Sequence, residues 1–262
     1  MAKESQGLIS ESSLQQILNE LAFKDEWINS AGTLEKLRGY LAALAVKIES
    51  DYKRGINSGF AISQNEKHVL VNSSLTDVYG RDVLLVYKIR RQRKNEIKVC
   101  FPSVLLSKAN LKSFGFNLED SKIKPIKFYD SADELLFHHD LTTFDLSEIS
   151  HSLQERIDRF PDNCRGLDLV TLYNCLKRSI EHTLEMNKRD YRFILPMYNL
   201  RRNKIQWLFP FWVINSYNCC PELCLIVSSE RGFAKVKTII GVDEAYTNTR
   251  LLTNPKGSWL TW

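Results

Sequence analysis

The chain has 262 residues, of which 44% are hydrophobic, 11% aromatic and 26% charged, and its formal net charge is +5. This composition excludes collagen-like, low-complexity and wholly disordered chains, because there is enough apolar surface to offset the chain entropy. No stretch approaches the roughly 18–20 apolar residues that span a bilayer, and no apolar run follows a basic start. We therefore expect a cytoplasmic protein without a membrane anchor.

The N-terminal part has helical periodicity. Apolar residues recur at helical spacing over residues 14–21 and again over residues 33–54, where Gly55 ends the second pattern. We assign residues 1–32 to a helical N-terminal extension and residues 33–262 to a single α+β domain.

The rest of the chain alternates between blocks of strands and helices. We expect strands over residues 60–63, 69–72, 83–89 and 97–101, and an edge strand over 122–129. Helices should follow over 146–157 and 167–186, and then strands over 192–195, 205–214, 222–227 and 236–240. This order favours an α+β fold with a largely antiparallel sheet and helices packed on one face, and it argues against a dinucleotide-binding fold.

Two basic segments are candidate nucleic-acid contacts. Residues 88–98 contain six positive charges, among them Arg90, Arg91 and Arg93, and should project as a hairpin loop between two strands. The second segment surrounds another expected hairpin and combines basic with aromatic residues, namely Arg189, Arg192, Tyr198, Arg201, Arg202, Lys204 and Trp207. Interleaved basic and aromatic side chains suit single-stranded nucleic acid, although a solvated charged loop is the simpler alternative. Two such segments in a chain of +5 imply an uneven charge distribution.

Cysteines and common motifs give no metal or cofactor assignment. Cys219, Cys220 and Cys224 lie close in sequence but lack the paired knuckles of a zinc site, so buried reduced thiols are the simpler interpretation. Metal binding by this cluster is left open, and we assign no metal site. The sequence contains no phosphate-binding loop, dinucleotide-binding, zinc-protease or serine-hydrolase motif.

Polar residues follow the last expected strand directly. Asp243, Tyr246, Asn248 and Arg250 place a carboxylate, a phenol, an amide and a guanidinium within eight residues of a strand end. Such groups form either a binding or catalytic site or a hydrogen-bonded plug that fixes the exit of the chain. Spacing alone leaves both alternatives open.

The last part of the chain also carries a family resemblance. The pattern consists of Thr238, Asp243, Ala245, Tyr246, Asn248, Arg250, Leu251, Pro255, Ser258, Trp259 and Leu260. It resembles the end of a mostly bacterial family of domains of unknown function, which occurs together with LOTUS-type (OST-HTH) winged helices or cold-shock modules. Looser similarity upstream, as at residues 71–75 and 222–227, extends the resemblance over residues 33–262. The resemblance implies an RNA-associated role.

Three hypotheses follow for the function. The first is a cytoplasmic module that binds single-stranded RNA or a nucleotide through the two basic hairpins and their aromatic neighbours. The second is an enzyme acting on RNA ends or a nucleotide phosphate, with Asp243 and Tyr246 as catalytic candidates and Asn72, Asn248 and Arg250 as ligand-binding residues in one pocket. The third is a structural or partner-binding domain. The sequence identifies no cofactor and no oligomeric state.

Overall fold

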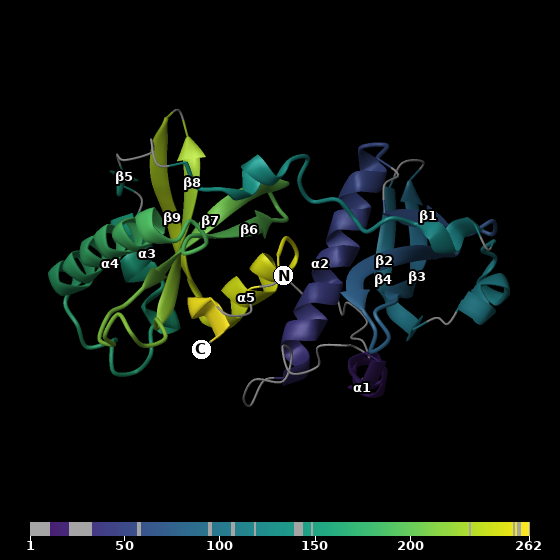
Figure 1. The fold of residues 1–262 in the computed structure, drawn as a ribbon, viewed down its shortest axis with the longest axis horizontal. Coiled ribbons are helices and arrows are strands. Elements are labelled where there is room, and N and C mark those ends of the chain that lie inside the picture. The colour runs from purple at the N-terminus through teal and green to yellow at the C-terminus, as the bar shows by residue number, and fades with distance from the viewer. Residues whose placement is uncertain are drawn as a thin grey trace. The chain divides into compact units, whose positions relative to one another are not determined.

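The structure is a computed structural model, shown in Figure 1. It describes residues 11–20, 33–56, 59–93, 96–105, 108–117, 119–138, 144–147, 149–230, 232–253, 255 and 258–261. The sequence predicts a single domain over 33–262, whereas the chain groups into two compact units, Met1–Lys127 and Phe128–Trp262. Each unit has a hydrophobic core of its own residues and is described by itself. Of the expected extension over 1–32, the structure describes residues 11–20.

The first unit begins with the two helices that the periodicity predicts. They are α1 (Glu11–Glu20) and α2 (Thr33–Lys53). In α2 the buried residues Leu37, Leu41, Leu44 and Ile48 recur at the helical period. This apolar face explains why the segment is a helix that packs on a sheet.

The sheet of the first unit is an antiparallel meander in the order β1-β2-β3-β4. Its strands are β1 (Phe60–Ile62), β2 (His68–Thr76), β3 (Asp82–Arg93) and β4 (Glu96–Leu105). Figure 1 shows α2 lying across this sheet, and the Tyr87 hydroxyl donates to the Leu41 carbonyl at 3.3 Å. The 3₁₀ helix η2 (Lys108–Phe114) covers the other face, where Leu111 packs against Leu84 and Val86.

The edge strand expected over residues 122–129 is not formed, so that prediction is wrong. After the 3₁₀ helix η3 (Glu119–Lys122) this segment has no regular structure. Pro125 lacks a backbone N–H, and Ile126 instead passes close to the backbone of Gly59. A Cβ on Gly59, whose φ is +83°, would lie 2.5 Å from Cα of Ile126. Close packing therefore fixes the segment without strand pairing.

The second unit is built on a mixed sheet in the order β5-β9-β8-β7-β6. The pairs among β6 (Leu195–Asn199), β7 (Lys204–Phe211), β8 (Leu223–Glu230) and β9 (Phe233–Gly241) are antiparallel. The two-residue β5 (Phe144–Asp145) pairs parallel with β9 and was not predicted, because two residues carry no periodicity. The predicted strand over 192–195 is displaced, since β6 begins at Leu195.

Helices cover both faces of this second sheet, whereas the sequence predicted one covered face. Helices α3 (Ile149–Glu155) and α4 (Leu169–Arg189) pack on the face that carries Phe209 and Leu225. Helix α5 (Val242–Arg250) and the 3₁₀ helix η6 (Trp259–Thr261) pack on the opposite face, against Leu208 and Ile226. Burial on both faces explains why these strands are apolar runs without alternation.

The helix predicted over 146–157 is shorter, because α3 ends at Glu155 and the 3₁₀ helix η5 (Ile157–Arg159) follows. Asp168 caps α4, and its carboxylate accepts from the Thr171 amide at 3.0 Å. Within the described part of the chain, no helix has the length and apolar character needed to cross a membrane.

Candidate functional site

The polar residues that follow the last strand lie in a helix, which the sequence analysis did not predict. Helix α5 begins at Val242 directly after β9, with Gly241 at its N-cap position. Asp243 and Glu244 occupy the first turn, where carboxylates are favoured by the amide dipoles. The polar run that follows β9 is thus a helix.

The helical geometry divides the four candidate residues. Tyr246 is 3% exposed and belongs to the core between α5 and the sheet, whereas Asp243 is exposed. Arg250 is partly buried and lies seven residues after Asp243, on the same side of the helix and roughly 10 Å along it. Asn248 lies on a different side, because five residues correspond to well over one turn. One ligand cannot therefore contact all four side chains along a single face of α5.

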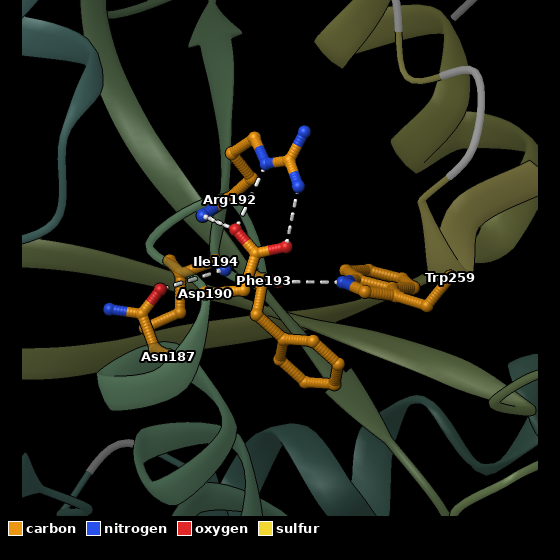
Figure 2. A network of polar contacts seen from close by, with 6 residues as sticks. All are labelled: Asn187, Asp190, Arg192, Phe193, Ile194 and Trp259. Atoms are coloured by element: carbon orange, nitrogen blue, oxygen red, sulfur yellow. Dashed lines mark hydrogen bonds and ion pairs between the residues drawn. The ribbon is translucent and has the colours of Figure 1, made fainter.

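Trp259, the tryptophan of the closing pattern, anchors the segment after α5. Its indole Nε1 donates to the Phe193 carbonyl at 2.7 Å, in the connection between α4 and β6, as Figure 2 shows. In the same connection, the Asn187 side chain accepts from the Ile194 amide at 3.2 Å. The Trp259 side chain is buried, so its role in the structure is to hold two distant segments together.

Arg159 braces the junction at which β9 enters α5. Its guanidinium donates to the Ile239 carbonyl at 2.8 Å and lies 3.8 Å from the Glu244 carboxylate. The carbonyl of a sheet edge and the first turn of a helix are thereby tied to one side chain. Together with the burial of Tyr246 and Trp259, this contact gives the closing pattern the geometry of a hydrogen-bonded brace.

Asn72 lies in the first unit, while the other four candidate residues belong to the second. It is fully buried in β2, and its amide donates at 3.0 Å to both the Asp82 carboxylate and the Ile123 carbonyl. Its side-chain oxygen accepts from the amide of Ser74, whose φ is 61°. These bonds hold the irregular stretch of β2 and account for the Asn without a ligand.

Cys220 and Cys224 have the properties of structural thiols, whereas the expectation of a buried thiol is wrong for Cys219. Cys219 is exposed, Cys220 is partly buried and Cys224 is buried in β8. Burial raises the pKa of Cys224 well above its usual value, and burial together with the charge of Glu222 raises the pKa of Cys220. Raised values disfavour the thiolate that metals bind. Among the residues that the structure describes, no group of three His, Cys, Asp or Glu side chains is placed to hold a metal.

Glu222 holds the connection between β7 and β8. Its carboxylate accepts from three consecutive backbone amides, those of Val213, Ile214 and Asn215, at 3.0, 2.8 and 2.7 Å. A carboxylate bound by successive amides is a strong local constraint. The structure therefore gives this acidic position a role in fixing the loop.

The first basic segment is mostly strand, whereas the sequence predicted a projecting loop. β3 continues through Arg90 and Arg91 to Arg93, and β4 begins at Glu96. The intervening residues 94–95 and the side chain of Arg93 lie outside the described part of the chain. The basic side chains are thus carried by a rigid two-stranded ribbon.

Strand geometry sorts these cations onto two faces. Lys88 and Arg90 share one face of β3, and Lys98 lies directly opposite Arg90 on β4. We call Lys88, Arg90 and Lys98 the basic face; none of them forms an ion pair with another described residue. Arg91 is on the other face of β3, where it forms an ion pair with Glu66 at 2.7 Å. Lys88 and Arg90 are therefore exposed cations without an ion pair to a described residue, whereas Lys98 is partly buried and its charge acts on the Glu49 carboxyl.

His68 lies beside the basic face, and the positive charge there affects its pKa. It lies opposite Lys88 in the β2–β3 register, and its ring packs edge-on against Phe114 at 5.2 Å. Burial lowers the pKa of His68 below its usual value, and the ammonium groups of Lys88 and Lys67 lower it further. The imidazole is a titratable reporter beside the three cations.

The charge of the chain is divided unequally between the units, as the two basic segments implied. Residues 1–127 contain 20 Lys and Arg against 14 Asp and Glu, a formal charge of +6. Residues 128–262 contain 16 against 17, a formal charge of −1. The entire net positive charge therefore belongs to the unit that carries the basic face.

The aromatic residues of the second basic segment are core residues. Trp207 is 8% exposed and packs edge-on against Phe137 at 5.5 Å, while Tyr198 is buried against Phe128. Neither ring presents a face on which a base could stack. In a sequence, an aromatic next to basic residues is read as a contact surface, but here β6 and β7 turn these rings inward.

The basic residues of the second basic segment differ in whether they are paired with an acid. Arg201 and Arg202 are exposed in the β6–β7 turn, where their backbone amides donate to the Asn199 side chain at 3.1 Å. Lys204 is exposed at the start of β7. Arg192 is paired with Asp190 through two hydrogen bonds of 2.9 Å (Figure 2), and the hydrogen bonds from Arg192, followed by its charge, lower the pKa of that carboxyl.

Sequence reasoning missed the aromatics that the structure exposes. Phe233 is 50% exposed at the β8–β9 turn, and Tyr79 is 78% exposed at the β2–β3 turn. Each lies beside a glycine with positive φ, Gly232 and Gly80 respectively. An aromatic residue next to a turn glycine was the available signal, because hairpin tips project into solvent.

The fold and these contacts define an α+β protein of two sheet-based units. The chain belongs to the family described as a domain of unknown function (DUF3825), whose profile matches residues 18–259. The expectation of such a family is thereby confirmed. Comparison with curated proteins and with solved structures gives no significant match.

Proposed function

We propose that this protein is a cytoplasmic module that binds single-stranded RNA through the basic face of β3 and β4 and through the β6–β7 turn. The observation that carries the proposal is the alignment of Lys88, Arg90 and Lys98 on one face of a rigid ribbon. Strand pairing fixes the backbone positions of these cations on one face, so that their side chains can contact successive phosphates.

Three further features support single-stranded RNA as the ligand. The unit that carries the basic face has a formal charge of +6, which favours association with a polyanion. The exposed Arg201 and Arg202 supply planar guanidinium groups for phosphate or base contacts. The resemblance to domains that accompany LOTUS-type and cold-shock modules supports RNA over DNA.

The proposed cytoplasmic location has its own support. The six free cysteines are in keeping with a reducing compartment.

The enzymatic alternative has less support from the geometry. Tyr246 is buried in the core, Asn248 lies on another side of α5 and Asn72 is bonded within β2. No observation places a nucleophile and a base together around Asp243. We therefore propose a binding role and assign Asp243 and Arg250 no reaction.

Titration of a fluorescent single-stranded RNA of mixed sequence tests the proposal. If four to six cations contact phosphates, raising the salt from 50 to 200 mM should weaken binding by about 50- to 300-fold. A duplex DNA of equal length serves as the comparison and should bind more weakly. Absence of binding at 50 mM, or equal affinity at both salts, would contradict the proposed function.

A further inference from the structure

The turns at one end of the second sheet form a compact basic patch around an exposed ring. We call Arg202, Lys204, Glu230 and Phe233 the turn patch. Phe233 lies directly opposite Glu230 in the β8–β9 register, so both side chains are on the same face of the sheet. Arg202 of the β6–β7 turn lies 3.8 Å from the Glu230 carboxylate. This contact brings together two turns that are far apart in sequence.

The turn patch has an excess of positive charge. Glu230 is bonded by Lys237 at 2.8 Å, and this bond, followed by the charges of Lys235 and Lys204, lowers its pKa. Arg202 lies 3.8 Å from the same carboxylate, and Lys235 lies 3.4 Å from Asp145. Among the members of the turn patch, the two cations Arg202 and Lys204 outnumber the one carboxylate, that of Glu230.

The backbone position of Phe233 is set by the β8–β9 turn. Gly232, with φ of 84°, forms the turn, and the pairing of Phe233 with Glu230 fixes the strand that follows. On the neighbouring hairpin, Asn199 fixes the turn that carries Arg202. A half-exposed ring beside fixed cations resembles the arrangement in which a base stacks and its phosphates meet basic side chains.

From this geometry we infer that Phe233 is a stacking platform for a base of single-stranded RNA, with Arg202 and Lys204 contacting the adjoining phosphates. The inference rests on the proposed function and assigns its base contact to a residue that sequence reasoning did not select. It replaces Trp207 and Tyr198, whose rings are buried. The surrounding cations favour a polyanion over a protein partner, because the centres of protein interfaces are depleted of charge.

Two tyrosines, Tyr79 and Tyr191, are more exposed than Phe233, and the surroundings of Tyr79 are less suited to RNA. Arg81 lies 4.9 Å from the centre of its ring, but that guanidinium is paired with Asp77 at 2.7 Å. Asp82 adds a second carboxylate at this turn. Phosphates would therefore meet no excess of positive charge there.

The test compares Phe233→Ala, Phe233→Trp and the wild-type protein. A 12-nucleotide oligouridylate and an abasic strand of equal length are the probes, at 50 mM salt. Phe233→Ala should weaken oligouridylate binding about tenfold without changing the salt dependence, and Phe233→Trp should retain it. The abasic strand should bind the wild type and Phe233→Ala equally, because it has no base to stack. Tyr191→Ala removes an exposed ring elsewhere in the unit and should have no effect.

The outcomes separate this inference from the proposed function. If the wild type binds oligouridylate and Phe233→Ala binds it equally well, the stacking role is overturned while RNA binding stands. A loss of affinity that is equal for the abasic strand would also overturn it, since the ring would then act through something other than a base. If the wild type binds neither probe at 50 mM salt, the proposed function fails and the inference fails with it.

Discussion

Removal of two cations from the basic face gives the sharpest test of the RNA-binding proposal. In the variant Arg90→Ala/Lys98→Ala, two contacts with phosphates would be lost. Ion release from single strands contributes a salt slope of about 0.7 per phosphate, so the slope should fall by about 1.4. The corresponding loss of affinity is about 70-fold at 50 mM salt and about 10-fold at 200 mM.

A matched control separates the basic face from the net charge of the protein. Arg91→Ala/Lys53→Ala removes two cations from the same unit, but Arg91 is paired with Glu66 at 2.7 Å and Lys53 with Glu96 at 2.8 Å. This control should retain the wild-type slope. Exposed pairs contribute about 0–1 kcal/mol each, so both variants should melt within a few degrees of the wild type.

Fluorescence anisotropy at several salt concentrations measures these slopes directly. Equal losses in the two double variants would show that net charge, and not the basic face, determines binding. Wild-type affinity in Arg90→Ala/Lys98→Ala would show that RNA, if bound, contacts another surface. Either result would refute the assignment of phosphate contacts to the basic face.

Three further predictions follow from individual contacts. In an NMR titration His68 should have a pKa below its usual value, and bound RNA should raise that pKa by neutralising Lys88 and Lys67. Because the pKa is lowered in the folded state, the contribution of His68 to stability is complete above about pH 6.5 and is lost as the pH falls below that value. Replacing Trp259 by Phe removes the buried hydrogen bond to the Phe193 carbonyl and should cost about 1–3 kcal/mol in urea unfolding, and an unchanged midpoint would contradict the brace. Asp168→Ala removes the cap of α4 and should cost about 1 kcal/mol, whereas Asp168→Asn should restore most of that loss.

Local sequence patterns determined much of the secondary structure. The apolar spacing of α2 and α4, the Asp168 cap and the β-branched runs of the first sheet all act within a few residues, so they can be read without knowledge of the fold. The α+β class follows from the order of these elements and is confirmed.

Tertiary packing decided what local patterns leave open. β7 and β8 are mainly apolar because helices cover both faces of the second sheet, and a buried run does not reveal how many faces are covered. The same packing turned Trp207 and Tyr246 into core residues, although in sequence each stands among polar or basic neighbours.

For the candidate site too, the sequence determines one part and the tertiary structure another. The sequence by itself determined that basic residues concentrate in two segments, because charge is a property of composition. Only the structure decided which cations act together: strand pairing put Arg90 beside Lys98 and turned Arg91 toward Glu66. Register is set by contacts between distant segments, and a shift of one residue exchanges the two faces of a strand. For the same reason, the contact of Arg202 with Glu230, the residue opposite Phe233, depends on pairing across several strands and has no counterpart in local sequence.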